Sequence, residues 1–346
     1  MNEITIDSLK VRIPIEQVTV IDATIFSHKL VVDGVTGEIE KEFEQKRFRH
    51  NYDGITTSFG IEEQVTGEQK VKKYLVVLYN SKLLHERYFE GITSDNIRLV
   101  YDRIIALKKV SFSYESFLDS AGTDVDYKLD TEVKHFDKSI KKLYSHVKPT
   151  KKVGRGCNCF DKMKNKGIEF GKRETSTPAS PYLKIYHKGL ELVHNSSIFY
   201  RKYLKGAGDY SNKVRLEFTI KNRKHFKKYC IEDTSLRSIL SIKQTQLEGI
   251  VKSILSTHIE PRMIDIKAPT DMTPMDATLY NAIVLLMHQG LNYNLIRESL
   301  VQSSTGVAKS RQRRKLDSIY ESAIRGLEVD SISQEQANFF EAIGWG

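Results

Sequence analysis

Three stretches of the sequence alternate apolar side chains with polar or charged ones. They are residues 125–133 (VDYKLDTEV), 182–188 (YLKIYHK) and 214–221 (VRLEFTIK). This two-residue period is typical of β-strands, because successive side chains of a strand point to opposite faces of its sheet. The apolar positions would face a core. If the three strands share one sheet, its other, open face carries Asp130, Glu132, Glu217, Tyr182, Tyr186, Lys188 and Arg215.

The chain around these strands repeats one order of elements. Before 125–133 the pattern predicts strands at 11–15, 18–25, 54–61 and 73–79 and a helix at 94–107. The second set has strands at 167–171 and 182–188, a helix at 190–204 and the strand at 214–221. Two successive strand–strand–helix–strand units predict an α+β fold, in which one antiparallel sheet carries helices on one face.

Strand patterns stop near residue 230. Beyond it, apolar residues recur at helical spacing in 235–255, 277–291, 293–301 and 314–327. We therefore predict a sheet domain at 1–230 and a helical C-terminal domain at 231–346. The hydrophobic fraction of 40%, with 15 Phe and 17 Tyr, is large enough to bury a core and excludes wholesale disorder.

The net charge of +10 is concentrated in three segments. Lys and Arg outnumber Asp and Glu by nine to two in 148–173, by ten to two in 201–228 and by five to none in 309–315. Clustered positive charge indicates a polyanionic partner, most simply nucleic acid. The sequence has no apolar run near the roughly 20 residues that span a bilayer and no signal-peptide pattern at its start. We expect a cytoplasmic protein without a membrane partner.

The three cysteines cannot form a disulfide framework with none left over. Cys157 and Cys159 stand closer together than the paired ligands of most zinc knuckles, and only Cys230 lies elsewhere. We therefore expect free thiols in a reducing compartment and not a zinc site.

The polar face of the predicted sheet holds residue types that suit phosphate chemistry. The carboxylates of Asp130 and Glu217 can hold a hard divalent cation. Tyr186 stands two residues before Lys188, whose positive charge would favour the phenolate and so make the tyrosine a nucleophile. The alternative is an ordinary solvated face with ion pairs between strands.

Four short motifs give this face a recognisable pattern. They are GKRET at 171–175, IYHK at 185–188, RLE at 215–217 and KLD at 128–130. Their order resembles the core of rolling-circle replication initiators of the staphylococcal-plasmid and filamentous-phage gene II types. Those proteins have a G-x-R-x-S turn, an I-Y-x-K strand, an R-x-E strand and an R-x-D strand, so here Thr175 replaces Ser and Lys128 replaces Arg. The resemblance covers about residues 7–230 and implies an endonuclease fold of that family.

The resemblance implies a role for each matched residue. Tyr186 would attack a DNA phosphodiester, join the 5′ phosphate and leave a 3′-OH primer, with Lys188 beside it. Asp130 and Glu217 would bind Mg²⁺ or Mn²⁺. Glu132 or His135 would supply a further ligand, because Lys134 stands where the plasmid proteins have a second carboxylate. The expected DNA contacts are Arg173 and Arg215 of the motifs and Arg311, Arg313 and Arg314 of the basic segment 309–315.

The implied function is therefore nicking and joining of origin DNA, single-stranded or supercoiled double-stranded, in a bacterial cytoplasm with host helicase and polymerase as further partners. Two alternatives stay open. One is a DNA- or RNA-binding regulator of similar fold that does not cut. The other is a strand transferase of the relaxase or transposase kind, which would pass the strand to a different partner.

Overall fold

The computed structural model describes residues 3–26, 28–32, 35–36, 39–44, 47–65, 71–145, 147, 157–162, 165–170, 182–259, 272–288, 291–302 and 305–325. The chain divides into two compact units. The first unit is Met1–Asp130, Leu190–Ser211 and Glu217–Leu247, and the second is Thr131–Gly189, Asn212–Leu216 and Glu248–Gly346.

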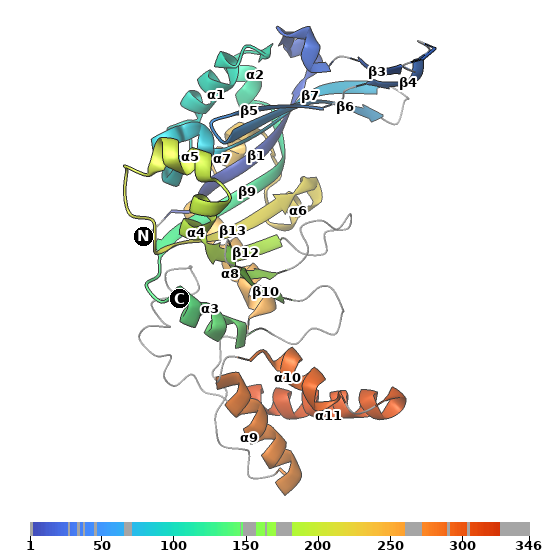
Figure 1. Ribbon diagram of the computed structural model, residues 1–346, viewed down its shortest axis with the longest axis vertical. Helices are drawn as coiled ribbons and strands as arrows, with labels where there is room; N and C mark the ends of the chain where they lie inside the picture. Colours follow the sequence, from blue (N-terminus) through green and yellow to red (C-terminus); the bar gives the residue numbers. More distant parts are fainter. Residues whose placement is uncertain are drawn as a thin grey trace. The chain divides into compact units, whose positions relative to one another are not determined.

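A nine-stranded sheet has the strand order β10-β11-β12-β13-β9-β1-β7-β6-β5 (Figure 1). The bounds in that order are Cys157–Lys162, Asn165–Phe170, Tyr182–His187, Lys213–Lys221, Ala121–Glu132, Thr5–Pro14, Val71–Asn80, Ile55–Val65 and Arg47–Tyr52. Two small sheets pair β2 (Thr19–Val20) with β8 (Val110–Ser111) and β3 (His28–Val32) with β4 (Ile39–Glu44). The predicted α+β class with a large antiparallel sheet is confirmed.

Other helices of the described residues are α1 (Ile97–Ala106), α2 (Tyr114–Leu118), α3 (Phe136–Ser145), α4 (Lys188–His194), α5 (Ser197–Phe199) and α6 (Asn222–Lys228). Short 3-10 segments are η1 (Ile15–Gln17), η2 (Ala23–Phe26) and η3 (Ser81–Glu90), and η4 (Tyr200–Leu204) is a π-helix. The strand predicted at 18–25 was wrong apart from β2. The backbone turns there, since the N–H of Thr24 donates to the side chain of Asp22.

The core of the first unit lies on one face of β1 and β7. Leu9 stands opposite Tyr79, and both are buried. The ring of Phe117 in α2 lies 5.7 Å from the ring of Tyr79 and 5.7 Å from that of Tyr101 in α1. Helices therefore cover this face of the strands.

The opposite face of β1 is only partly covered. The carboxylate of Glu62 in β6 accepts hydrogen bonds from Lys10 and Arg12 of β1. All three side chains keep about a quarter to a third of their surface exposed. At this end of the sheet one face is packed and the other meets water, as alternation predicts.

A two-residue turn, Asp53-Gly54, joins β5 to β6. Both residues have positive φ angles, 50° and 77°, which a type I′ hairpin turn requires. A β-carbon on Gly54 would lie 2.8 Å from the backbone nitrogen of Phe199 in α5. Glycine thus permits both the turn and the close approach of α5.

Replacing Gly54 with alanine should lower the free energy of unfolding by at least about 1 kcal/mol. The new β-carbon would strain a left-handed backbone and contact Phe199. Urea unfolding of Gly54→Ala measures the loss. Gly206→Ala is the matched control, because a β-carbon there meets nothing within 4 Å. Equal stability of the two variants would contradict this account of the turn.

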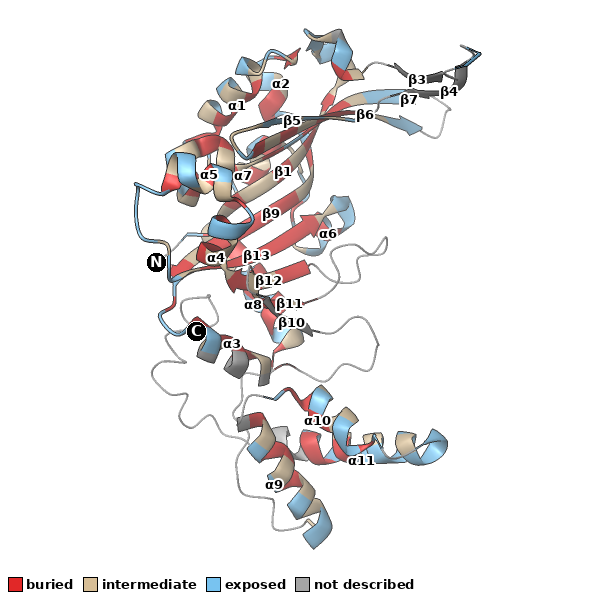
Figure 2. Cartoon of the chain, in the orientation of Figure 1, coloured by how far each residue is buried: buried red, intermediate tan, exposed pale blue. Residues whose placement is uncertain are grey.

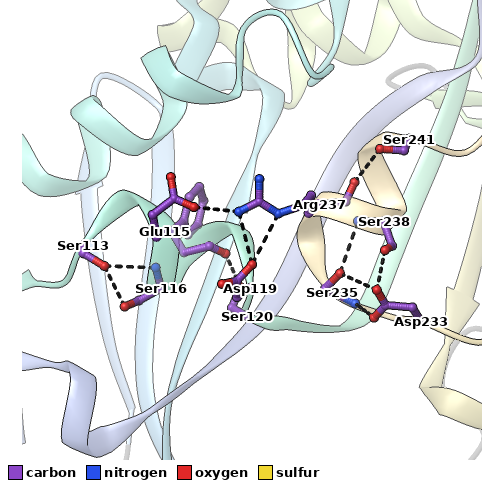
Figure 3. A network of polar contacts seen from close by, with 11 residues as sticks. Ser113, Glu115, Ser116, Asp119, Ser120, Asp233, Ser235, Arg237, Ser238 and Ser241 are labelled. Carbon is purple, nitrogen blue, oxygen red and sulfur yellow. Dashed lines mark hydrogen bonds and ion pairs between the residues drawn. The ribbon is translucent and has the colours of Figure 1, made fainter.

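The helix predicted over 235–255 is two helices, α7 (Leu236–Leu240) and α8 (Gln244–His258). α7 ends at Ser241, whose hydroxyl donates to the carbonyl of Arg237. Arg237 also fastens α7 to α2, since its guanidinium lies 2.7 Å from Glu115 and 3.2 Å from Asp119 (Figure 3). Apolar spacing continues through the break and therefore does not reveal it.

In the second unit, β11 and β12 pack one apolar face. Ile168 stands opposite Ile185 and Phe170 opposite Leu183, and all four are buried. His258 at the end of α8 stacks on Phe170 at 5.2 Å between ring centres. The polar side chains of β12 consequently occupy the other face of the strand.

The C-terminal helices α9 (Pro274–His288), α10 (Tyr293–Leu300) and α11 (Gly306–Arg325) enclose a core of their own. The rings of Tyr293 and Tyr320 stack at 4.0 Å. The hydroxyl of Tyr293 donates to Asp317, and burial raises the pKa of this phenol, so it stays a donor. No helix among the described residues is long and apolar enough to cross a lipid bilayer.

Candidate functional site

Tyr186 lies near the end of β12, on the face opposite Leu183 and Ile185. Its exposed fraction is 3%. Its phenol oxygen accepts a hydrogen bond from Nζ of Lys188 at 3.3 Å. The sequence placed Lys188 on the strand, but β12 ends at His187, and Lys188 reaches the phenol as the first residue of α4.

A second lysine contacts the ring of Tyr186. Nζ of Lys184 lies 4.1 Å from the centre of this ring and 5.3 Å from that of Phe160 in β10. Positive charge near a phenol favours its ionised form, through the oxygen and through the ring face alike. Tyr186 is therefore held by two cations, an arrangement that suits a nucleophilic phenolate.

Gly167 makes room for this arrangement. It stands opposite Tyr186 in the pairing of β11 with β12. A β-carbon on Gly167 would lie 2.3 Å from the carbonyl oxygen of Ile185, 2.7 Å from Cβ of Tyr186 and 2.8 Å from the ring of Phe160. Any larger residue would push Tyr186 or Phe160 away, so glycine sets the position of the phenol.

Tyr182 lies on the same face of β12, but its hydrogen-bond partner is negatively charged, whereas the partners of Tyr186 are positively charged. Its hydroxyl donates to Oε2 of Glu169 at 3.0 Å. A neighbouring carboxylate disfavours a phenolate, because two negative charges would then meet. Of the two tyrosines, Tyr186 has the surroundings of a nucleophile and Tyr182 those of a hydrogen-bond donor.

In the first unit, Lys128 of β9 is buried with an exposed fraction of 1%. Its ammonium group donates to the carbonyls of Tyr88 and Phe89 at 2.9 and 3.1 Å and to Asp130 at 2.8 Å. Three acceptors match the three protons of an ammonium group. The charge of Asp130 is thus balanced by a lysine inside the protein.

Glu217 lies on the neighbouring strand. The hydroxyl of Thr219 in β13 donates to Asp126 in β9, which also accepts from Ser8 at 2.6 Å. Glu217 precedes Thr219 by two residues and so projects from the same side of β13, the strand next to β9. Its exposed fraction is 6%. The two carboxylates that the sequence assigned to a metal therefore share a face and a region with this lysine.

We tested whether these residues suit a divalent cation. Oxygen donors are the right chemistry for Mg²⁺ or Mn²⁺. However, Asp130 already takes its positive partner from Lys128 at 2.8 Å, and a second cation at this carboxylate would meet the repulsion of the ammonium group. In the arrangement that the structure describes, Lys128 supplies at Asp130 the positive charge that a divalent cation would supply.

The expectation of an open polar face was wrong at the centre of the sheet. In β13 every residue from Val214 to Ile220 is buried, on both faces (Figure 2). Arg215 has no exposed surface, so its guanidinium is not free to meet a DNA phosphate, as the sequence had suggested. Alternation correctly separated the two faces of these strands, but it carries no information about what covers each face.

The other predicted site residues are scattered. Glu132 is exposed, and its carboxylate lies 3.5 Å from Nζ of Lys213, as in an ordinary surface ion pair. Arg173, like the whole 171–175 turn of the resemblance, lies outside the described residues. Cys230 is free and exposed.

The three arginines of α11 differ in their surroundings. Arg313 donates to the carboxylate of Glu298 in α10. Arg311 and Arg314 are exposed and form no ion pair with any residue that the structure describes. Sequence composition treated the three as equivalent.

Three residues that position the candidate site received no role from the sequence. Gly167 and Lys184 shape the surroundings of Tyr186, and Lys128 neutralises Asp130. The signal for Lys128 was its place inside an alternating strand, and the signal for Lys184 was its shared face with Tyr186. Nothing in the sequence marked Gly167.

Comparisons of the chain with protein-family models, curated proteins and solved structures gave no match.

Lys128→Met should lower the free energy of unfolding by about 3–5 kcal/mol, because it removes the cation that pairs with the buried Asp130 and donates to two carbonyls. Lys213→Met is the matched control and should cost less than about 1 kcal/mol, since Lys213 pairs with the exposed Glu132. Urea unfolding of both variants gives the comparison. A small loss at Lys128 would mean that Asp130 finds another cation.

Proposed function

We propose that the chain is a DNA-nicking and strand-joining enzyme with Tyr186 as the nucleophile, of the kind that initiates rolling-circle replication. One observation carries the proposal: the phenol oxygen of Tyr186 lies 3.3 Å from Lys188 Nζ while Lys184 covers its ring at 4.1 Å. A phenol needs such help, because tyrosine is otherwise protonated at neutral pH and attacks slowly.

The proposed reaction is the one that the resemblance to rolling-circle initiators implies. The phenol oxygen attacks the phosphorus of a DNA phosphodiester, the bond to the 3′ oxygen breaks, and the 5′ phosphate stays joined to Tyr186. The released strand ends in a 3′-OH, which can prime synthesis. Lys188 stabilises the attacking oxygen and then the charge that develops on the phosphate oxygens. Attack by a 3′-OH on the tyrosine ester reverses the step and joins strands.

The burial of Tyr186 sets a condition on this mechanism. With an exposed fraction of 3%, its oxygen meets a phosphate only after neighbouring groups move. Lys184 is only half-buried, and a phosphate near it would attract its ammonium group away from the ring. We therefore expect DNA binding to open the site.

Charge on the first unit supports a nucleic-acid partner. Arg223, Lys224, Lys227 and Lys228 are all exposed on α6. Among the residues that the structure describes, Lys227 alone of these four has a carboxylate within ion-pair range, Glu232 at 3.7 Å. Such a short basic helix suits contacts to a phosphate backbone, which make binding strongly dependent on salt. Origin DNA as substrate, and host helicase and polymerase as partners, stay predictions of the resemblance.

A second function is favoured by the same burial. A tyrosine with 3% exposure and lysine partners is also a satisfactory structural residue. The chain would then bind DNA or RNA without cutting it, as a regulator of replication or transcription does. The covalent step separates the two functions, because a binding protein forms no ester with its nucleic acid.

Tyr186→Phe should abolish the covalent adduct between the protein and DNA while binding and thermal stability stay nearly unchanged. The substitution removes one hydroxyl group and keeps the ring that packs against Lys184. The assay uses single-stranded oligonucleotides of the proposed origin, labelled at the 3′ end because the fragment joined to the protein keeps that end, and scores label that migrates with denatured protein. Tyr182→Phe is the matched control and should keep the adduct, since Tyr182 is hydrogen-bonded to Glu169.

An adduct that survives in Tyr186→Phe and disappears in Tyr182→Phe would move the nucleophile to Tyr182. No adduct with any origin fragment, despite tight binding, would favour the non-cutting regulator. The same reaction run with and without EDTA reports whether a divalent cation is needed, which stays a prediction of the resemblance.

Lys188→Met should slow adduct formation about 100-fold or more, because it removes a hydrogen bond to the phenol oxygen from a charged donor. Lys184→Met should slow it less than about tenfold, because a cation above the ring acts more weakly than one at the oxygen. Single-turnover rates at saturating DNA measure both. Equal rates for Lys188→Met and the parent protein would remove Lys188 from the mechanism.

A further inference from the structure

The C-terminal bundle uses only half of its longest helix for packing. α11 begins at Gly306, yet its buried residues begin at Leu316 and continue with Ile319 and Tyr320. The ten residues from 306 to 315 include none that is buried, and Figure 2 shows this end of α11 as exposed. At about 1.5 Å per residue, roughly 15 Å of helix extends beyond the core.

This projecting half carries a strong positive charge. It contains Lys309, Arg311, Arg313, Arg314 and Lys315, and no Asp or Glu occurs from 306 to 316. A helix of like charges gains nothing from its own sequence, since cations three or four residues apart repel each other. The charge must be balanced from outside the helix.

The bundle itself balances two of the five cations. Arg313 donates to the carboxylate of Glu298 in α10, and Nζ of Lys315 lies 2.7 Å from Asp276 in α9. Arg313 shares a stripe with the buried Leu316 and Tyr320, three and seven residues later. These contacts fasten α11 to its neighbours, so Arg313 and Lys315 serve the fold.

The opposite stripe of α11 has no such partners. Val307, Arg311 and Arg314 follow one another at intervals of four and three residues and so line one side of the helix. Val307 is 67% exposed. Arg311 and Arg314 are exposed and pair with no carboxylate in the part of the chain that the structure describes. This side of the helix thus has an exposed apolar side chain next to two arginines that are not neutralised. Such a surface is complementary to a negatively charged partner that also offers apolar groups for contact.

We propose that this stripe of α11 binds in the major groove of double-stranded DNA and reads its sequence. The groove is about 12 Å wide and admits one helix, and its base edges offer guanine acceptors for arginine and thymine methyl groups for apolar contact. Arg311 and Arg314 stand about 5–6 Å apart at their β-carbons, close enough to address neighbouring base pairs. RNA duplexes fit less well, because their deep, narrow major groove excludes a helix.

The choice of DNA as the partner rests on the proposed function. The inference adds a means to select a DNA sequence, which the nicking site does not provide. Tyr186 with two lysines recognises a phosphodiester, which is the same at every position of a strand. Base edges differ from one site to another. A duplex-reading helix outside the nicking chemistry would thus direct it to one place.

The experiment selects duplexes bound by the full chain from a library of random 20-base-pair DNA and then measures affinity for the enriched duplex and for unselected duplexes. In R311A/R314A the preference for the enriched duplex should fall tenfold or more. R313A/K315A is the matched control, because it removes the same charge from the fold-serving positions. It should lose affinity for both duplexes about equally and keep the preference.

A third variant separates charge from base reading. R311K/R314K keeps both charges but removes the paired donors that bind guanine, so the preference should fall while affinity for unselected duplexes stays. Thermal melting of all three variants confirms that the bundle folds. Equal loss of preference in R311A/R314A and R313A/K315A, or no enrichment of any duplex, would overturn the inference.

The outcome is independent of the chemistry at Tyr186. Selection and affinity are measured with Tyr186→Phe as well as with the parent chain. If no adduct ever forms but R311A/R314A still loses the preference, the proposed nicking fails and the groove-reading helix stands. If adducts form and the preference is unchanged in R311A/R314A, only the groove reading fails.

Discussion

The ammonium group of Lys128 is the constraint around which the first unit is arranged. A buried charge costs several kcal/mol unless it is paired and hydrogen-bonded. Lys128 meets this demand with Asp130 and with the carbonyls of Tyr88 and Phe89, which end η3. The last turn of η3 therefore lies against β9, and its aromatic rings cover the lysine, that of Tyr88 at 4.9 Å. A polar strand face thereby becomes interior without leaving its charges unbalanced.

In the second unit, buried polar groups are also paired, but the groups concerned are tyrosine hydroxyls. β12 buries two tyrosines on its polar face, and their partners have opposite charge. Glu169 accepts from Tyr182, whereas Lys188 donates to Tyr186. One phenol thus donates to a carboxylate and the other accepts from an ammonium group, so the polar face of this strand is interior with its polar groups paired.

In α11, helical geometry separates the cations that are paired within the bundle from those that are exposed. A period of 3.6 residues places Arg313 with the core positions and Arg311 with the exposed ones, although they stand two residues apart. Glu298 and Asp276 neutralise Arg313 and Lys315. Arg311 and Arg314 remain as exposed positive charges on the other side of the helix.

The sequence by itself determined that 125–133, 182–188 and 214–221 are strands, which of their side chains share a face, and that helices follow them. It also predicted that Tyr186 and Lys188 are neighbours, but the strand that it predicted for both ends at His187, and Lys188 reaches the phenol from the start of α4. Only the tertiary structure decided that the polar face is interior at Arg215 and Glu217, that Lys128 balances Asp130, and that Gly167 sets the place of Tyr186. Alternation records the side of a strand from which each side chain projects. Burial and charge balance depend on segments far away in the chain, which no local pattern contains.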